Sequence, residues 1–205
     1  MKLMTLVLSV SFIVVSSANA VDEAEFKVVE CEDRFEIRDY SPQILAETIV
    51  GENMEDAGNV AFRRLFKYIS GENTLTNKIA MTAPVGQERT SEKIAMTAPV
   101  SQQAEGDRWA VSFMMPQSYT MQTIPRPTNT QIRLREVPAR RVAAVRYSGF
   151  WSEKRYKRYL EQLQGWMKRK GLNPAGDPIW ARYNPPFTPW FMRRNEILIP
   201  LEQQP

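Results

Sequence analysis

Phenylalanine and basic side chains share the outer face of a predicted helix that begins at Asn53 and ends at Gly71. At about 100° per residue, Phe62 falls at the edge of the apolar stripe of this helix and Phe66 falls beyond it. The polar residues around Phe66 on that face are Asn59, Arg63 and Lys67. Rings of this kind bind the body of a flat apolar ligand, and basic side chains bind its acid groups. We therefore predict a ligand groove here; the alternative is that a loop covers Phe66.

A second aromatic cluster lies in residues 184–195, the connection between the last two predicted strands. Connections are usually polar. This one contains three prolines and four large apolar residues, which are Phe187, Trp190, Phe191 and Met192. Arg193 and Arg194 follow directly. Two compatible interpretations remain: a hydrophobic lid that closes one end of the sheet, or an aromatic clamp for a ligand with Arg193 beside it.

The chain has 205 residues, one cysteine and no histidine. The missing histidine excludes a Ser-His-Asp triad, a Cys-His nucleophile pair, and zinc or haem held by histidine. The acids Glu47, Glu136 and Glu196 are scattered along predicted strands without the spacing of a metal site or an acid–base pair. We expect no catalytic and no metal-ligating residue; a single glutamate acting in a cleft is the alternative.

The N-terminus has the pattern of an export signal. A charged start at Lys2 precedes an apolar run from Leu3 to Val15, and an Ala-x-Ala site ends at Ala20. The thirteen residues of this run are fewer than the roughly 20 that span a bilayer. We expect cleavage after Ala20, a single mature domain over residues 21–205, and a periplasmic or secreted location without stable membrane insertion. An uncleaved anchor is the alternative.

The formal net charge is +4, from 27 basic and 23 acidic residues. The basic residues are spread rather than grouped, so we expect a solvated surface and no nucleic-acid partner. A single cysteine in an oxidising compartment forms no internal disulfide. We expect Cys31 to be buried in a strand; the alternative is that it pairs with another chain.

The elements that must position the two clusters follow from local patterns. The predicted strands are Phe26–Glu32, Arg34–Tyr40, Ile44–Val50, Trp109–Met115, Ile132–Val137, Arg140–Ser148, Ile179–Tyr183 and Glu196–Leu201, the first two with half-buried alternation. A second helix begins at Ser152 and ends at Gly171. The predicted core stripe of the first helix is Ala57, Ala61, Leu65, Tyr68 and Ile69. That of the second is Tyr156, Tyr159, Leu160, Leu163, Trp166 and Met167.

An octapeptide occurs twice, as residues 78–85 and 93–100. Alternate apolar residues give each copy one apolar side, so we predict two strands facing the same core. Met81 and Met96, which correspond in the two copies, should lie at similar depth.

The order of elements is strand, strand, helix, strand, strand in residues 26–116 and again in residues 132–201. We therefore predict two repeated units that pack their helices against one shared antiparallel sheet, curved or closed, which is an α+β fold.

Several separate motifs, in order, resemble the SOUL haem-binding protein family from about Glu30 to Leu201. They are residues 35–40 (FEIRDY), 62–71 (FRRLFKYISG), the two KIAMTAPV copies, 109–116 (WAVSFMMP), 135–138 (REVP) and 193–196 (RRNE). The resemblance implies a distorted antiparallel β-barrel flanked by two α-helices. It also implies noncovalent binding of haem or another tetrapyrrole in a shallow apolar cleft.

In that family the cleft involves the first helix and the loop before the last strand. Phe62, Phe66 and Lys67 match the helix face implicated there. Asn59 stands where some members carry a basic residue, and Thr188 stands where some carry lysine. The resemblance therefore implies looser pairing with the haem propionates than in those members.

An axial histidine, proposed for one branch of the family, is excluded here. Met192, Tyr183 and Cys31 carry groups that ligate iron in other proteins, but nothing marks any of them. We expect haem bound without a strong axial ligand, for carriage or buffering rather than catalysis. The alternatives are a binding module for another amphipathic small molecule, since the fold also resembles effector-binding domains of multidrug-responsive regulators; an enzyme acting on tetrapyrroles or lipids; and an envelope interaction protein.

Overall fold

The computed structural model describes residues 21–51, 53–75 and 90–202. Its elements, in chain order, are β1 (Asp22–Glu23), β2 (Phe26–Glu32), β3 (Phe35–Tyr40), β4 (Gln43–Val50), α1 (Met54–Ile69), β5 (Asn73–Thr74), β6 (Thr97–Ala98), β7 (Val100–Glu105), β8 (Arg108–Met114), β9 (Arg126–Pro127), β10 (Ile132–Val137), β11 (Arg140–Tyr147), α2 (Glu153–Lys170), β12 (Ile179–Arg182), a 3-10 turn η1 (Trp190–Met192) and β13 (Asn195–Pro200).

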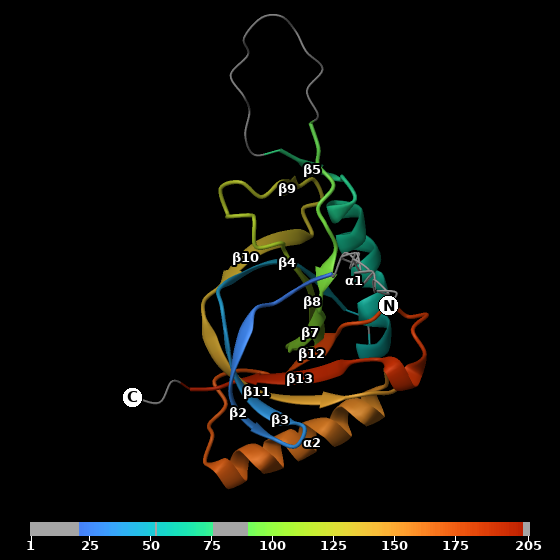
Figure 1. The fold of residues 1–205 in the computed structure, drawn as a ribbon. Coiled ribbons are helices and arrows are strands. Elements are labelled where there is room, and N and C mark those ends of the chain that lie inside the picture. The colour runs from blue at the N-terminus through green and yellow to red at the C-terminus, as the bar shows by residue number, and fades with distance from the viewer. Residues whose placement is uncertain (1–20, 52, 76–89, 203–205) are drawn as a thin grey trace, which may run out of the picture.

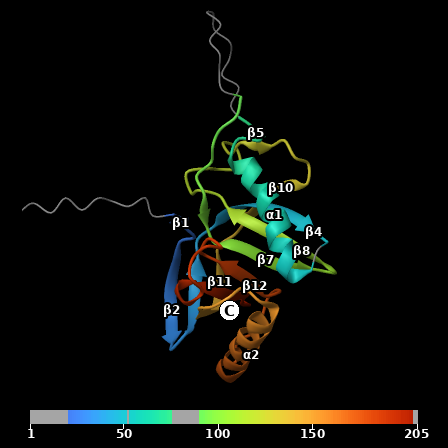
Figure 2. The ribbon, with the colours of Figure 1, turned by 90° about the vertical axis from the view of Figure 1, so that its right-hand side faces the viewer.

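Nine strands form one antiparallel sheet in the order β10-β4-β8-β7-β12-β13-β11-β3-β2. The sheet curls into an open, distorted barrel (Figure 1). Helix α1 packs across β4 and β8, and α2 packs across β11 and β13. Figure 2, turned by 90°, shows the two helices over different parts of the sheet. The α+β class and the distorted antiparallel barrel are confirmed.

The centre of the sheet is the pair β7–β12, in which the first long strand after α1 pairs with the first strand after α2. Beyond this pair, β8 and β4 follow on one side, and β13 and β11 follow on the other. The next strands are exchanged between the two halves of the chain. Strand β10 of the second half pairs with β4 of the first, and β3 of the first half pairs with β11 of the second. The exchange ties residues 132–137 to residues 43–48, so neither half of the chain completes the sheet alone. A repeat in the sequence itself stays a prediction.

Both helices begin and end where their capping residues indicate. The Asn53 side chain accepts hydrogen bonds from the backbone N–H groups of Glu55 and Asp56, as an N-cap does. Gly171 closes α2 with φ 68°, a left-handed conformation that glycine adopts without a Cβ clash. All five residues of the predicted α1 stripe are buried, and the predicted α2 stripe is buried or half-buried. These stripes confirm which face of each helix meets the sheet.

Strand β2 lies at the sheet edge and is more exposed than its alternating pattern predicts. Val28 and Val29 are 44% and 48% exposed. Cys31 is exposed too, so its expected burial is wrong. The reason is tertiary: β2 pairs with β3 alone, and no layer of the described chain covers it.

The octapeptide prediction is wrong for the second copy and lies outside the described residues for the first. Residues 93–96 form no strand, and the short β6 follows them. Met96 is 42% exposed whereas Ile94 is buried, so the expected alternation is absent. Pro99 interrupts strand pairing because it has no N–H to donate. The regular strand is β7, at residues 100–105, where the sequence pattern predicted none.

Residues 1–20, where the export signal is predicted, also lie outside the described residues. Among the residues that are described, no helix is long and apolar enough to cross a membrane.

Candidate functional site

The outer face of α1 presents the predicted groups to the surface. Asn59, Arg63, Phe66 and Lys67 are exposed along this face. Phe66 keeps 46% of its surface exposed among the described residues. Its ring stacks on Phe62 with 5.8 Å between centroids. Within the described residues, Lys67 forms a single ion pair, long and exposed, at 3.7 Å with Glu72, which holds it weakly.

Phe62 joins this surface to the core. Its ring meets Phe113 of β8 edge-on, at 5.3 Å between centroids, and it is half-buried. It therefore supports Phe66 from below and offers a ligand little area of its own.

The aromatic loop surface is the more exposed of the two clusters. We use this name for Phe150, Phe187, Trp190, Phe191 and Met192. Their exposed fractions run from 48% for Trp190 to 85% for Phe187. Trp190 stacks on Phe150 at 5.8 Å and meets Phe191 edge-on at 5.6 Å. Rings this exposed do not close the end of the sheet, so the lid interpretation is wrong.

Arg193 stabilises the conformation of the loop that carries the aromatic loop surface. Its Nε donates to the carbonyl oxygen of Thr188 at 2.7 Å, and its Nη2 donates to that of Pro186. The guanidinium also lies over the rings of Phe150 and Trp151, at 5.8 and 4.8 Å. These contacts tie residues 186–193 to the segment that precedes α2.

The residues predicted to bind the ligand number nine and fall into two groups. The α1 group is Asn59, Phe62, Arg63, Phe66 and Lys67, and the loop group is Phe187, Trp190, Phe191 and Arg193. Figure 1 shows the loop before β13 at the level of the first turns of α1, whereas Phe66 and Lys67 belong to its last turns, toward β5. Ring contacts join residues within each group, and none joins the groups in the described part of the chain. That the two form one cleft stays a prediction.

Arg182 lies between α1 and Trp151, the residue whose ring Arg193 also contacts, and sequence reasoning missed it. Its guanidinium lies 5.3 Å from the Trp151 ring and 5.0 Å from the Trp180 ring. On its other side it meets α1 at Gly58, where an added Cβ would lie 2.3 Å from Nη2. A glycine in the interior of a helix lowers stability by about 1 kcal/mol relative to alanine. Gly58 was therefore the one feature of the sequence that indicated a side chain packed closely against this part of α1.

The side chain of Arg182 is 8% exposed. Its Nη2 donates to Gln102 Oε1 at 3.1 Å, and no carboxylate pairs with it among the described residues. Burial lowers the pKa of Arg182 to about 10, and the neighbouring Tyr147 opposes that change. The group therefore remains a cation at neutral pH.

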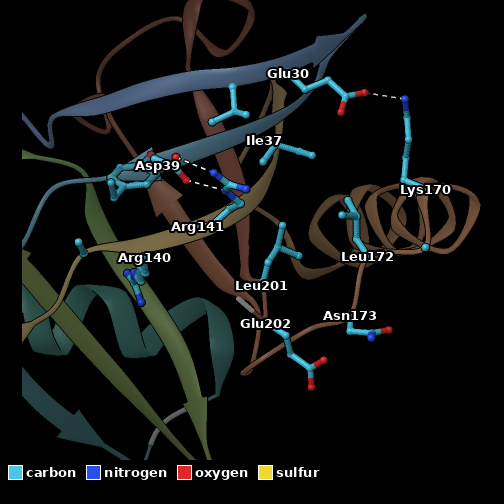
Figure 3. Close-up of a pocket in the computed structure, with 14 residues that line it drawn as sticks. Glu30, Ile37, Asp39, Arg140, Arg141, Lys170, Leu172, Asn173, Leu201 and Glu202 are labelled. Carbon is cyan, nitrogen blue, oxygen red and sulfur yellow. Dashed lines mark hydrogen bonds and ion pairs between the residues drawn. The ribbon is translucent and has the colours of Figure 1, made fainter. Parts of the chain in front are cut away.

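A cavity of about 810 Å³ lies elsewhere, between the β2–β3 hairpin, the end of α2 and the C-terminal segment (Figure 3). None of the nine predicted residues lines it. Four of its charged groups form ion pairs, Arg141 with Asp39 at 2.7 Å and Lys170 with Glu30 at 2.6 Å. The Arg140 guanidinium points away from the others in Figure 3. This cavity therefore offers no free cation to an acidic ligand.

Three solved structures share the fold. The C-terminal domain of EcmrR has a TM-score of 0.54 at 11% identity, over 83% of this chain and 98% of that one. EcmrR in a complex with DNA has 0.55 at 11% identity, over 83% and 57%. A hydrolase from Listeria innocua has 0.50 at 11% identity, over 85% and 94%. Likeness at this identity shows the fold alone.

No curated protein matches the chain. The family model described as SOUL heme-binding protein matches residues 21–200, nearly all of the part that follows the predicted signal. The chain belongs to the SOUL heme-binding protein family.

Proposed function

We propose that this protein binds haem or a related tetrapyrrole noncovalently at the aromatic loop surface and carries or buffers it. The observation that carries the proposal is that five large apolar side chains gather on the surface around Arg193, a cation with no carboxylate partner among the described residues. Family membership supports the ligand class.

The residues present suit a flat, apolar molecule with acid groups. Trp190 and Phe191 offer ring faces and edges, and aromatic burial dominates the energetics of such surfaces. Arg193 is held by two backbone carbonyls, so its position is set before a ligand arrives. Phe66, with Arg63 and Lys67 beside it, supplies the second wall of the proposed cleft.

We propose binding without a strong axial ligand. The chain has no histidine. Cys31 lies on edge strand β2 and is not among the residues of the aromatic loop surface. The hydroxyl of Tyr183 donates to Glu196 at 3.0 Å, which keeps it engaged inside the sheet. Affinity then comes from buried apolar area, about 25 cal/mol per Å² before binding costs, and from acid–arginine contacts.

Two of the three acids singled out in the sequence, Glu196 and Glu47, support a noncatalytic role. Glu196 is fully buried and accepts from Arg38 and Arg194. Glu47 is also buried and accepts from Arg133 at 2.7 Å and Arg135 at 2.9 Å. A general base needs a free lone pair directed at substrate. Neither carboxylate has that freedom.

We also propose export, with cleavage after Ala20 and function in the periplasm or outside the cell. The apolar run of residues 3–15 and the site at Ala20 support it. The intact mass of protein recovered from the exporting cell tests it. A mature chain that begins at Val21 is expected, and a mass that still includes residues 1–20 would overturn the proposal.

Titration of the mature protein with haemin, followed by absorbance, tests the binding function. We expect a shifted Soret band that saturates at a fixed stoichiometry. The triple variant Phe187→Ala, Trp190→Ala, Phe191→Ala should lose most of this binding. Its matched control is Val28→Ala, Val29→Ala, which removes exposed apolar residues from edge strand β2. A monotonic drift without saturation would overturn tetrapyrrole binding and favour another amphipathic ligand or a docking role.

A further inference from the structure

Behind the aromatic loop surface, unpaired polar atoms gather around Arg182. In the part of the chain that the structure describes, the buried side-chain atoms that make no hydrogen bond of normal geometry include Arg182 Nε, Tyr147 Oη, Trp151 Nε1, Trp180 Nε1 and Asn195 Oδ1. Buried polar groups in folded proteins nearly always have partners, so such a group of exceptions needs an explanation.

Strand pairing places three of these residues in one row. Tyr147 of β11 pairs with Asn195 of β13, and Asn195 pairs with Arg182 of β12. Paired residues of neighbouring strands point to the same face, about 4.8 Å apart. All three lie on the helix-covered face, because Tyr147 stacks on Tyr159 of α2 at 4.1 Å and Arg182 meets Gly58 of α1.

The two tryptophans border the same row. Trp180 precedes Arg182 by two residues on β12, and its indole faces the Tyr147 hydroxyl. Burial raises the pKa of Tyr147, and a loose hydrogen bond from the Trp180 indole N–H to the Tyr147 hydroxyl opposes this rise, although its geometry falls outside that of a normal hydrogen bond. The Arg182 guanidinium also lies over the Trp151 ring, at 5.3 Å from its centroid.

This row carries the chemistry of an anion site. The Tyr147 hydroxyl, the two indole N–H groups and Arg182 Nε–H are donors, Asn195 Oδ1 is the one acceptor among these five atoms, and the Arg182 guanidinium lies over both indole rings. A buried cation without an acidic partner is costly, and two indole faces offset only part of that cost. A carboxylate would give the cation an acidic partner and the unpaired donors an acceptor, because its two oxygens match the planar guanidinium and accept from neighbouring donors.

Trp151 connects this row to the aromatic loop surface. The Arg193 guanidinium lies 4.8 Å from its ring, and that of Arg182 lies 5.3 Å from it. Trp151 is half-buried, and Phe150 beside it is 54% exposed and stacks on Trp190. The contacts therefore run without a break from exposed rings to the buried guanidinium.

We propose that Arg182, with the donors of Tyr147, Trp151 and Trp180, forms a receptor for a carboxylate of the ligand that the aromatic loop surface binds. This inference rests on the proposed function and names the group recognised: an acid arm on a flat apolar body. The arm enters beside Trp151, and the unpaired donors then gain acceptors.

Haemin and its dimethyl ester, which has no free carboxylate, test the receptor by absorbance titration. The wild type should bind haemin at least tenfold more tightly than the ester. Arg182→Met should reduce this ratio to near one. The matched control is Arg158→Met, since Arg158 also lies over a ring, that of Tyr159 at 4.8 Å, but on the exposed face of α2. An unchanged ratio in Arg182→Met would overturn the receptor.

A second probe separates failure of the receptor from failure of tetrapyrrole binding. Fluorescence titration compares 1-pyrenebutyrate, a flat ring system with one carboxylate, with the neutral 1-pyrenebutanol. If haemin does not bind but the wild type prefers pyrenebutyrate and Arg182→Met does not, the receptor stands and the tetrapyrrole proposal fails. If the wild type prefers neither acid over its neutral analogue, the receptor is overturned.

Tyr147→Phe keeps the inference testable should Arg182→Met fail to fold. It removes one unpaired donor and keeps the ring that stacks on Tyr159. We expect a loss of two- to tenfold in affinity for whichever acid binds, with no change for its neutral analogue. Equal affinities for the acid in wild type and Tyr147→Phe would overturn the receptor.

Discussion

Arg38 and Glu196 form an ion pair inside the curled sheet, with 2.6 Å between Nη1 and Oε2 and side-chain exposures of 2% and 0%. Nη2 donates to the second carboxylate oxygen at 3.2 Å. The Tyr183 hydroxyl and Arg194 Nε also donate to this carboxylate, at 3.0 and 2.9 Å. The pair is thus saturated, unlike Arg182 on the opposite face of the sheet.

Removing one partner of this pair should destabilise the fold strongly. Arg38→Met leaves the Glu196 charge buried with less compensation, for which about 3–5 kcal/mol is the usual loss. Urea denaturation measures the free energy of unfolding, and Arg158→Met serves as the exposed control. A loss under about 1 kcal/mol would contradict the structural role of the pair.

Arg182→Met should have the opposite effect on stability. The lowered pKa of Arg182 shows that burial disfavours its charged form, so the cation is a destabilising group below pH 10. A methionine removes this charge and keeps an apolar side chain in the same place, although it is too short to reach the position of the guanidinium beside Gly58. We expect an unfolding free energy equal to or up to about 2 kcal/mol above that of the wild type. Marked destabilisation would mean that the cation holds α1 to the sheet.

Acid should weaken the protein through Glu196. Burial by itself would raise the pKa of this carboxyl, but the hydrogen bonds and charges of Arg38 and Arg194 outweigh it and hold the pKa below 4.5. A lowered folded-state pKa contributes stability that is full above pH 4.5 and is lost as pH falls through the folded value. Unfolding free energy measured from pH 7 to pH 3 should fall below pH 4.5, and less steeply in Glu196→Gln. A wild-type profile that is flat to pH 3 would be inconsistent with this pair.

Phe66→Ala should separate ligand contact from packing. Phe66 is 46% exposed while Leu65 and Ile69 hold the buried stripe, so stability should change by within about 1 kcal/mol while haemin affinity falls. Lys67→Glu should weaken binding further by repelling the propionates, more at low than at high salt.

The matched controls for these changes lie on α2. Lys157→Glu and Lys168→Glu alter exposed lysines in the same way and should leave haemin affinity unchanged. Unfolding of Phe66→Ala, with normal haemin binding per folded molecule, would show that Phe66 is a packing residue.

The haemin spectrum should not depend on the thiol. Cys31 is exposed on β2, where its Sγ contacts only the carbonyl oxygen of Asp33, at 3.9 Å, among the described residues. Cys31→Ser should therefore leave the absorbance of the haemin complex nearly unchanged. A thiolate-type spectrum in the wild type that disappears in the variant would identify Cys31 as the ligand and move the site to β2.

Helices and strands were predicted more accurately from the sequence than the burial and pairing of their residues. The apolar stripes of α1 and α2 follow from residues three and four apart, which a helix always brings to one face. The alternation in β2 also predicted a strand, but it gave the wrong burial, because burial depends on whether another layer covers the edge. For residues 93–100, Pro99 prevented the pairing that alternation indicated.

By itself, the sequence determined the two helices, most strands of the sheet, the exposed Phe66 and the apolar connection that ends at Arg193, because each depends on neighbours in the chain. Only the tertiary structure decided that Tyr147, Asn195 and Arg182 form one row. Strand order sets that adjacency: β12 and β11 each pair with β13, and no local pattern records which strands will pair. The buried cation beneath Trp151 is therefore a property of the fold, whereas the exposed rings above it are a property of the chain.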